Sequence, residues 1–152
     1  KHLKLSSAID SEAFSLMSNI QTARKLAISD SKNIVLCGSS SNSECDSDWS
    51  NGYLLFADTN NNNQFDAEDD TLINYHKISV PEFNIRWRSF RGNKPIRFLP
   101  MGITWHNNGT FIMCINQFIV NFCASTTLLY VYCKISTLLK LPKRSMRDSG
   151  MR

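Results

Sequence analysis

The five cysteines are the residues whose spacing bears most directly on chemistry. Zinc sites and thioredoxin-like redox sites both use closely spaced cysteines, as in Cys-x-x-Cys. No such pair occurs here, and the three histidines are scattered along the chain. Disulfide bonds fit the spacing better, which indicates an oxidising compartment.

Cys37 and Cys45 enclose a segment of Gly, Ser, Asn and Glu. These residue types favour turns, so the chain can bring the two Cα atoms within bridging distance. We therefore predict a disulfide between Cys37 and Cys45. A second bridge would join Cys114 to either Cys123 or Cys133 and leave one thiol over. The alternative is that these three cysteines are small buried apolar residues.

The segment 58–70 carries oxygen-bearing side chains at alternate positions, as a calcium-binding loop does. The candidate ligands are Asp58, Asn60, Asn62, Asp66 and Asp69. The calcium-loop pattern is broken because Asn63 takes the place of the turn glycine and Asp69 that of the bidentate glutamate. We favour a solvated, Asn-rich hairpin loop, and we predict no metal and no other cofactor.

No catalytic arrangement accompanies these residues. The sequence contains no Gly-rich phosphate loop, no recognisable Ser-His-Asp context and no paired acid and base in an apolar setting. We therefore predict that the protein is not an enzyme.

Basic side chains are concentrated in the second half of the chain. Residues 1–80 contain 6 Lys/Arg and 11 Asp/Glu, a net charge of −5, whereas residues 81–152 contain 11 and 2, a net charge of +9. Net charge bears on association rather than on fold, so this asymmetry predicts a polyanionic partner. The candidate DNA-binding residues are Arg86, Arg88 and Arg91 in one cluster and Lys140, Lys143, Arg144 and Arg147 in another.

Each basic cluster has a structural alternative. In an alternating strand Arg86 and Arg88 share one face. Trp87, Phe90 and Phe98 lie close by in sequence and could stack on bases. We favour the alternative, in which these aromatic residues face the core. The second cluster either neutralises phosphates in a salt-dependent manner or forms a solvated tail.

A helix and a sheet must position these residues. Apolar or small residues recur at steps of three and four near the start of the chain, which predicts one face of an amphipathic helix. That face comprises Leu5, Ile9, Ala13, Leu16, Ile20, Ala23 and Ala27. Turn-forming residues at 30–33 end the helix.

Short β-rich runs separated by turn residues follow the helix, so the sequence predicts an α+β fold with one long helix on an antiparallel sheet. The predicted strands are 34–37, 52–57, 72–75, 83–88 and 96–99. Asn108-Gly109 predicts a hairpin turn between strands at 102–105 and 110–114.

Residues 111–133 carry no charge, and 17 of these 23 residues are apolar, which is long enough to cross a bilayer. Their interspersed Asn, Gln, Ser and Thr and their many β-branched and aromatic residues favour two or three core strands instead. We therefore divide the chain into an amphipathic helix at 1–30, a β-rich domain at 31–133 and a basic tail at 134–152.

The order of these motifs resembles that of the GspH/FimT family of minor type IV pilins and pseudopilins. The resemblance spans about residues 5–115 and rests on the helix end at 22–27, on Cys37 and Cys45, and on the Asp-Trp-x-x-Gly run at 48–52. It implies a type IV pilin-like fold, with a long N-terminal helix packed on antiparallel sheet. The membrane-anchoring half of that helix would precede Lys1.

The resemblance also implies a function. Such a protein would be a minor pilin in pilus assembly or the tip complex, located at the bacterial inner membrane facing the periplasm and in the pilus. Its partners would be other major and minor pilins, and the membrane through the preceding helix. The FimT branch is linked to DNA capture for natural transformation through a C-terminal Gly-Arg-x-Arg pattern.

That pattern is missing from residues 139–147, so double-stranded DNA as a partner is predicted from charge alone. Two alternatives stay open. A minor pseudopilin of type II secretion would share the fold but serve protein export, and a secreted calcium-binding module would use the loop at 58–69.

Overall fold

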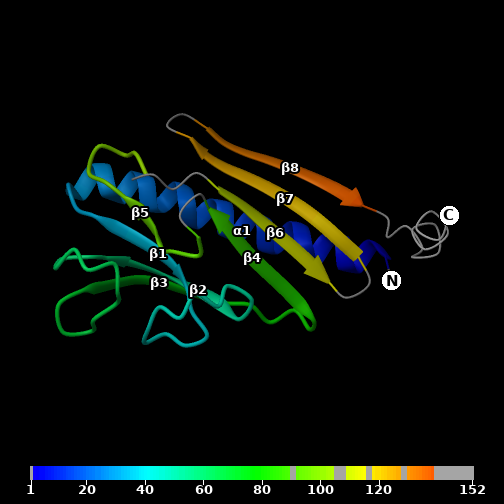
Figure 1. The fold of residues 1–152 in the computed structure, drawn as a ribbon, viewed down its shortest axis with the longest axis horizontal. Helices are drawn as coiled ribbons and strands as arrows, with labels where there is room; N and C mark the ends of the chain where they lie inside the picture. Colours follow the sequence, from blue (N-terminus) through cyan, green and yellow to red (C-terminus); the bar gives the residue numbers. More distant parts are fainter. Residues whose placement is uncertain (1, 90–91, 105–108, 116–117, 128–129, 139–152) are drawn as a thin grey trace, which may run out of the picture.

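A long helix and two antiparallel sheets form the fold in this computed structural model, which describes residues 2–89, 92–104, 109–115, 118–127 and 130–138 (Figure 1). Side chains are described for 7–89, 92–104 and 109–113. The elements are α1 (His2–Asp30), β1 (Ile34–Gly38), β2 (Gly52–Ala57), β3 (Thr71–Lys77), β4 (Phe83–Ser89), β5 (Ile96–Phe98), β6 (Gly109–Ile115), β7 (Phe118–Thr127) and β8 (Tyr130–Leu138). The α+β class predicted from the sequence is confirmed.

The strands pair in the orders β3-β2-β1-β5 and β4-β6-β7-β8. In Figure 1, α1 runs behind both sheets. One apolar core unites them, because buried side chains of α1 pack in the same cluster as those of β1, β2, β4, β5 and β6. The helix therefore fixes how the two sheets are placed.

The buried face of α1 is the predicted one. Its side chains at Ile9, Ala13, Leu16, Ile20, Ala23 and Ala27 are at most 3% exposed, and Leu5 precedes the described side chains. Two polar residues of α1 hold the edge strand β3: Glu12 lies 2.7 Å from the His76 ring nitrogen, and Asn19 accepts a 2.8 Å hydrogen bond from Asn74. The described helix, α1, is not apolar enough over its length to cross a membrane.

The strands β1 and β2 are buried on both faces, which explains why they read as continuous apolar runs. Ile34 and Leu36 face the core under α1, whereas Val35 and Cys37 belong to a second, smaller cluster on the opposite side of the sheet. Phe65 of the 58–70 loop packs against that cluster, so surface loops cover the face that the helix leaves open.

The hairpin predicted between 102–105 and 110–114 is wrong. β6 pairs with β4 along its whole length on one side, and its residues 112–115 pair with β7 on the other, so the strand neighbours of β6 are not 102–105. Thr104 instead forms an isolated bridge with Phe98 of β5. The glycine at 109 serves close packing, because a Cβ there would lie 2.4 Å from a ring carbon of Trp87.

The uncharged stretch at 111–133 is built from strands, as the sequence analysis favours over a membrane span. It contains the end of β6, all of β7 and the start of β8. β8 continues through Leu138, so the strand takes in residues 134–138, which the sequence analysis groups with the tail.

Candidate nucleic-acid interface

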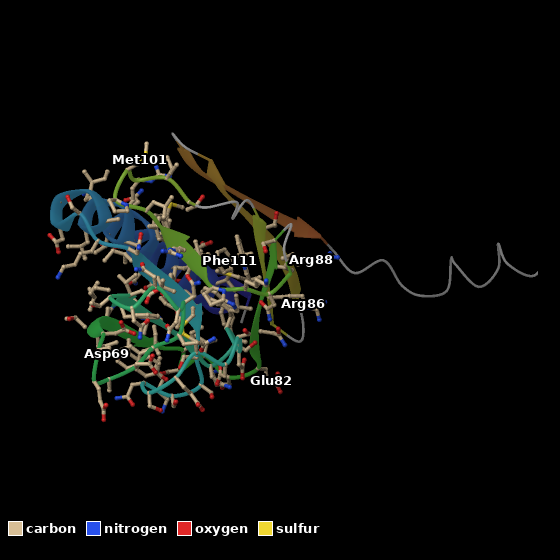
Figure 2. All side chains as sticks on the ribbon, turned by 60° about the vertical axis from the view of Figure 1, so that its left-hand side comes forward. Asp69, Glu82, Arg86, Arg88, Met101 and Phe111 are labelled. Atoms are coloured by element: carbon tan, nitrogen blue, oxygen red, sulfur yellow. A yellow bond between two sulfur atoms is a disulfide. The ribbon has the colours of Figure 1, made fainter. Side chains whose placement is uncertain are left out.

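Arg86 and Arg88 project from the outer face of β4, the edge strand of the second sheet (Figure 2). Burial alternates along this strand, with Phe83, Ile85 and Trp87 inside and the arginines exposed. Residues two apart on a strand are about 7 Å apart, so the two guanidinium groups start from neighbouring points on one surface. Within the described part of the chain, neither arginine side chain has a hydrogen bond or ion pair, although the backbone of both residues pairs with β6.

Two contacts fix β4 in this orientation. The Ser50 hydroxyl accepts a 3.2 Å hydrogen bond from the backbone N–H of Ile85 and donates a 3.3 Å bond to its carbonyl oxygen. On the inner face, the Trp87 ring packs on Phe111 with centroids 4.4 Å apart. Trp49 contacts the same phenyl ring edge-on at 5.1 Å. The inward aromatic residues therefore force the arginines outward.

The aromatic residues near these arginines do not form a stacking surface. Trp87 is 2% exposed and Phe98 is fully buried, so both belong to the core, as the sequence analysis favours; Phe90 lies outside the described residues. Asn84 is exposed on the same face as Arg86. The alternation of side chains along the strand that places the two arginines on the outer face also places Asn84 there, although the charge pattern of the sequence does not point to this residue.

The other basic residues of the second half of the chain are distributed differently. Arg97 is partly buried in β5 and donates a 2.9 Å hydrogen bond to Asn61, so it pins the 58–70 loop. Arg91 and the second cluster at Lys140, Lys143, Arg144 and Arg147 lie outside the described residues. The structure therefore brings together Arg86 and Arg88 out of the predicted set.

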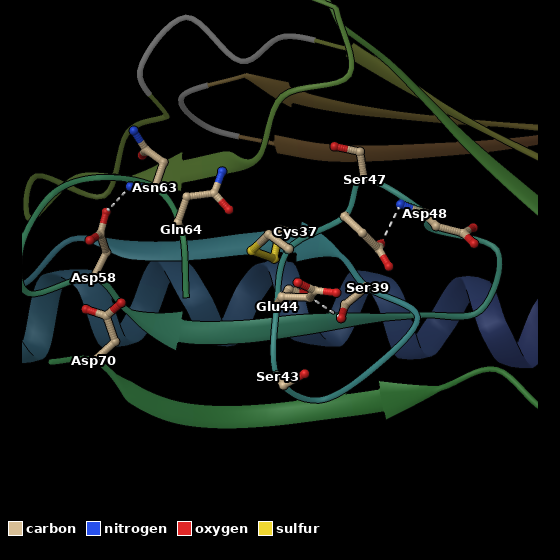
Figure 3. The surroundings of a disulfide bond; sticks show 12 residues. Cys37, Ser39, Ser43, Glu44, Ser47, Asp48, Asp58, Asn63, Gln64 and Asp70 are labelled. Carbon is tan, nitrogen blue, oxygen red and sulfur yellow. Dashed lines mark hydrogen bonds between the residues drawn. A yellow bond between two sulfur atoms is a disulfide. The ribbon is translucent and has the colours of Figure 1, made fainter. Parts of the chain in front are cut away.

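The loop before β2 is closed by a disulfide between Cys37 and Cys45 (Figure 3). The Ser39 hydroxyl donates to the Glu44 carbonyl oxygen at 2.5 Å, and the Ser40 amide donates to the Asp46 carboxylate at 2.9 Å. Burial alone would raise the pKa of Asp46, but hydrogen bonds from Ser40 and from the Asp48 amide lower it below its ordinary value. The side chains of Cys114, Cys123 and Cys133 are not described, so their pairing stays a prediction.

The disulfide loop reaches the segment that follows β4. Ser47 and Asn93 exchange hydrogen bonds of 3.1 and 3.2 Å through their side chains and carbonyl oxygens. Ser47 ties the loop to the segment after β4, and Ser50 ties it to Ile85 within β4. The disulfide loop thus helps position the strand that carries the arginines.

The oxygen-rich loop at 58–70 satisfies its own backbone. Asp58 accepts from the amide of Asn63 at 3.0 Å (Figure 3) and from that of Asn62 at 3.2 Å. Asp70 accepts from the amides of Thr59 and Asp66 at 2.8 and 3.0 Å. The described residues contain no group of three or more His, Cys, Asp or Glu side chains placed to hold a metal. The loop joins the paired strands β2 and β3, so it is a hairpin loop, as predicted, and one of its candidate calcium ligands, Asp58, is engaged by the loop's own backbone.

The sequence of the chain also matches a known family over most of its length. The model of the family described as "Type II transport protein GspH" matches residues 12–128. The chain belongs to the GspH family. The resemblance to GspH/FimT minor pilins and pseudopilins drawn from the helix end, the cysteine pair and the Asp-Trp-x-x-Gly run is thereby confirmed.

Solved structures agree with this GspH-family assignment at the level of the fold. Two crystal structures of the type IV minor pilin FimU from Pseudomonas aeruginosa match with TM-scores of 0.61 and 0.58, each at 17% identity. The first covers 89% of this chain and 90% of FimU, and the second 84% and 91%. No curated protein matches the chain. The GspH-family chain therefore has the type IV pilin-like fold that was expected.

Proposed function

We propose that this minor pilin is a subunit of a type IV pilus that takes part in pilus assembly at the tip and captures double-stranded DNA. The fold shared with the minor pilin FimU over nine-tenths of each chain supports the pilus assignment. Its partners would be other major and minor pilins. It would reside at the inner membrane facing the periplasm, anchored by a preceding helix, and in the pilus.

The observation that carries DNA capture is the pair of exposed arginines on β4. Arg86 and Arg88 have no acidic partner among the described residues, and they lie in the half of the chain with a net charge of +9. Arginine side chains about 7 Å apart on a strand can each meet a backbone phosphate. With Trp87 buried, the surface reads phosphates and not bases, which predicts binding without sequence preference.

A titration of double-stranded DNA against the full chain tests this proposal. Each lost phosphate contact lowers the slope of log K against log salt by about 0.9. We therefore expect Arg86→Ala/Arg88→Ala to weaken binding and to reduce the slope by about 1.8. Lys25→Ala/Lys32→Ala removes the same charge from exposed positions at the end of α1 and just beyond it, and should leave the slope nearly unchanged.

Two results would contradict the proposal. The absence of any complex at low salt would remove DNA capture altogether. A full slope in Arg86→Ala/Arg88→Ala, together with a loss in Lys143→Ala/Arg144→Ala/Arg147→Ala, would place the interface on the C-terminal tail and not on β4.

A minor pseudopilin of type II secretion is the second candidate, and the description of the matching family favours it. Such a subunit would share the pilin fold and its pilin partners but would serve protein export. Deleting the gene separates the two: loss of pili and of transformation supports the pilus role, whereas loss of secreted enzymes with intact pili supports the export role.

A further inference from the structure

The exposed arginines on β4 have a complementary surface elsewhere on the same molecule. The 58–70 loop carries five acidic residues and no basic one. Asp58 and Asp70 are buried and occupied by backbone amides, and Asp66 accepts from two asparagine side chains. Glu68 and Asp69 remain exposed at the turn, with no side-chain partner among the described residues.

These two charged surfaces cannot meet within one molecule. In Figure 2, Asp69 lies on the opposite side of the molecule from Arg86 and Arg88, with the core between them. Both surfaces are also held in place, since Arg97 and Asn33 pin the acidic loop through Asn61, and Ser50 fixes β4. Any pairing of the loop with the arginines therefore has to join two molecules.

We propose that the outer face of β4 docks a second copy of this chain, with Arg86 and Arg88 receiving Glu68 and Asp69 of the neighbour. The two surfaces are complementary in charge, since two cations and two anions have no side-chain partner among the described residues and each pair is presented from a surface held by hydrogen bonds. Opposite charges on two surfaces speed the association of the molecules and fix how they align, whereas like charges oppose association.

The contact has a consequence for assembly. It joins different surfaces of the two copies, so it is heterologous, and such contacts build open rows unless the rotation closes a ring. That behaviour suits a subunit of a filament. The inference rests on the proposed function and adds a second copy of this chain to the other pilins named there as partners. It also makes DNA and a neighbouring copy compete for the same two arginines.

Charge exchange between two variants provides the test. Arg86→Glu/Arg88→Glu leaves two acidic surfaces, and Glu68→Lys/Asp69→Lys leaves two basic ones, so neither variant should pair with itself. An equimolar mixture restores opposite charges at the contact. Sedimentation velocity of the full chain at low salt, over a series of protein concentrations, measures the association constant in each case.

We expect the wild type to associate, with weakening as salt is added. Each variant alone should associate at least about tenfold more weakly, because like charges now face each other, and the mixture should recover the wild-type constant. Lys25→Glu/Lys32→Glu is the matched control: it lowers the formal net charge from +4 to 0, as the arginine variant does, and should associate like the wild type.

Three results would overturn the inference: a wild type that stays monomeric at low salt, a mixture that stays dissociated, or a control that loses association as fully as the arginine variant. DNA binding is a separate readout. Glu68→Lys/Asp69→Lys keeps both arginines and should bind DNA at least as tightly as the wild type, so failure of docking and failure of DNA capture are distinguishable.

Discussion

Opening the ring closed by Cys37 and Cys45 should destabilise the protein by a predictable amount. Cys45→Ala removes the cross-link but keeps the buried Cys37 sulfur in the small cluster on the outer side of the first sheet. The two cysteines are eight positions apart, so the closed loop contains about nine residues. For a loop of that length the chain-entropy relation gives a loss of about 2.5 kcal/mol in the free energy of unfolding.

Urea unfolding followed by tryptophan fluorescence measures this loss. With a urea dependence of about 2 kcal/mol/M, the midpoint should fall by roughly 1 M. Cys37→Ala/Cys45→Ala should lose about 1 kcal/mol more, because it also removes a buried sulfur. The wild type unfolded in reductant is the matched control, and it should coincide with Cys45→Ala.

A loss below about 0.5 kcal/mol for Cys45→Ala would refute the reasoning, since it is far below what closure of so short a loop contributes. It would mean that the hydrogen bonds from Ser39 and Ser40 keep the loop compact even in the unfolded chain. A loss above about 5 kcal/mol would also contradict it, because β4 would then depend on the loop for its place in the fold.

Two further substitutions test contacts between elements. Gly102→Ala should cost about 1–2 kcal/mol, because φ is +79°; its Cβ would lie 2.6 Å from the end of the Ile28 side chain, which is 53% exposed and free to move aside. Gly92→Ala, at φ +86° with open space, should therefore cost a similar amount in thermal unfolding, and a cost more than about 2 kcal/mol higher at Gly102 would contradict this account of Ile28. Burial, and secondarily the Glu12 carboxylate, raises the pKa of Tyr53 above that of an ordinary tyrosine, so the wild type should lose stability as pH rises above about 10, where the unfolded chain gives up its proton. Tyr53→Phe should flatten that decline and change stability at neutral pH by less than about 1 kcal/mol, since the buried hydroxyl has only Asn19 near it and makes no hydrogen bond of good geometry with the described residues. An unchanged alkaline decline would contradict the assignment to Tyr53.

The elements that follow a local period could be read from the sequence. The steps of three and four from Ile9 to Ala27 mark the buried face of α1, because a helix repeats its contacts every 3.6 residues whatever it packs against. The alternation from Phe83 to Arg88 places the arginines in solvent for the same kind of reason. The candidate site on β4 was therefore within reach of sequence reasoning.

Contacts between distant segments could not be predicted from the sequence. The pairing of β6 with β4 overrides the hairpin that Asn108-Gly109 suggests, because the choice of neighbour depends on which edges are free in the assembled sheet. His76 reads as an isolated histidine, yet it stacks on Tyr53 at 4.9 Å and meets Glu12. Packing brings His76 together with Tyr53, 23 positions away, and with Glu12, 64 positions away, and sequence spacing gives no signal for either contact.

By itself the sequence determined the class of fold, the buried helix face, the exposure of Arg86 and Arg88, and the family, because each depends on periodicity or on a local run of residues. Only the tertiary structure decided which charges stay unpaired. Arg97 and Asp58 look as available as Arg86 and Asp69 in the sequence, but the first two are occupied within the fold. Pairing lowers the free energy of a charge only when a partner lies within a few ångströms, and those distances are fixed by the packing of α1 against both sheets.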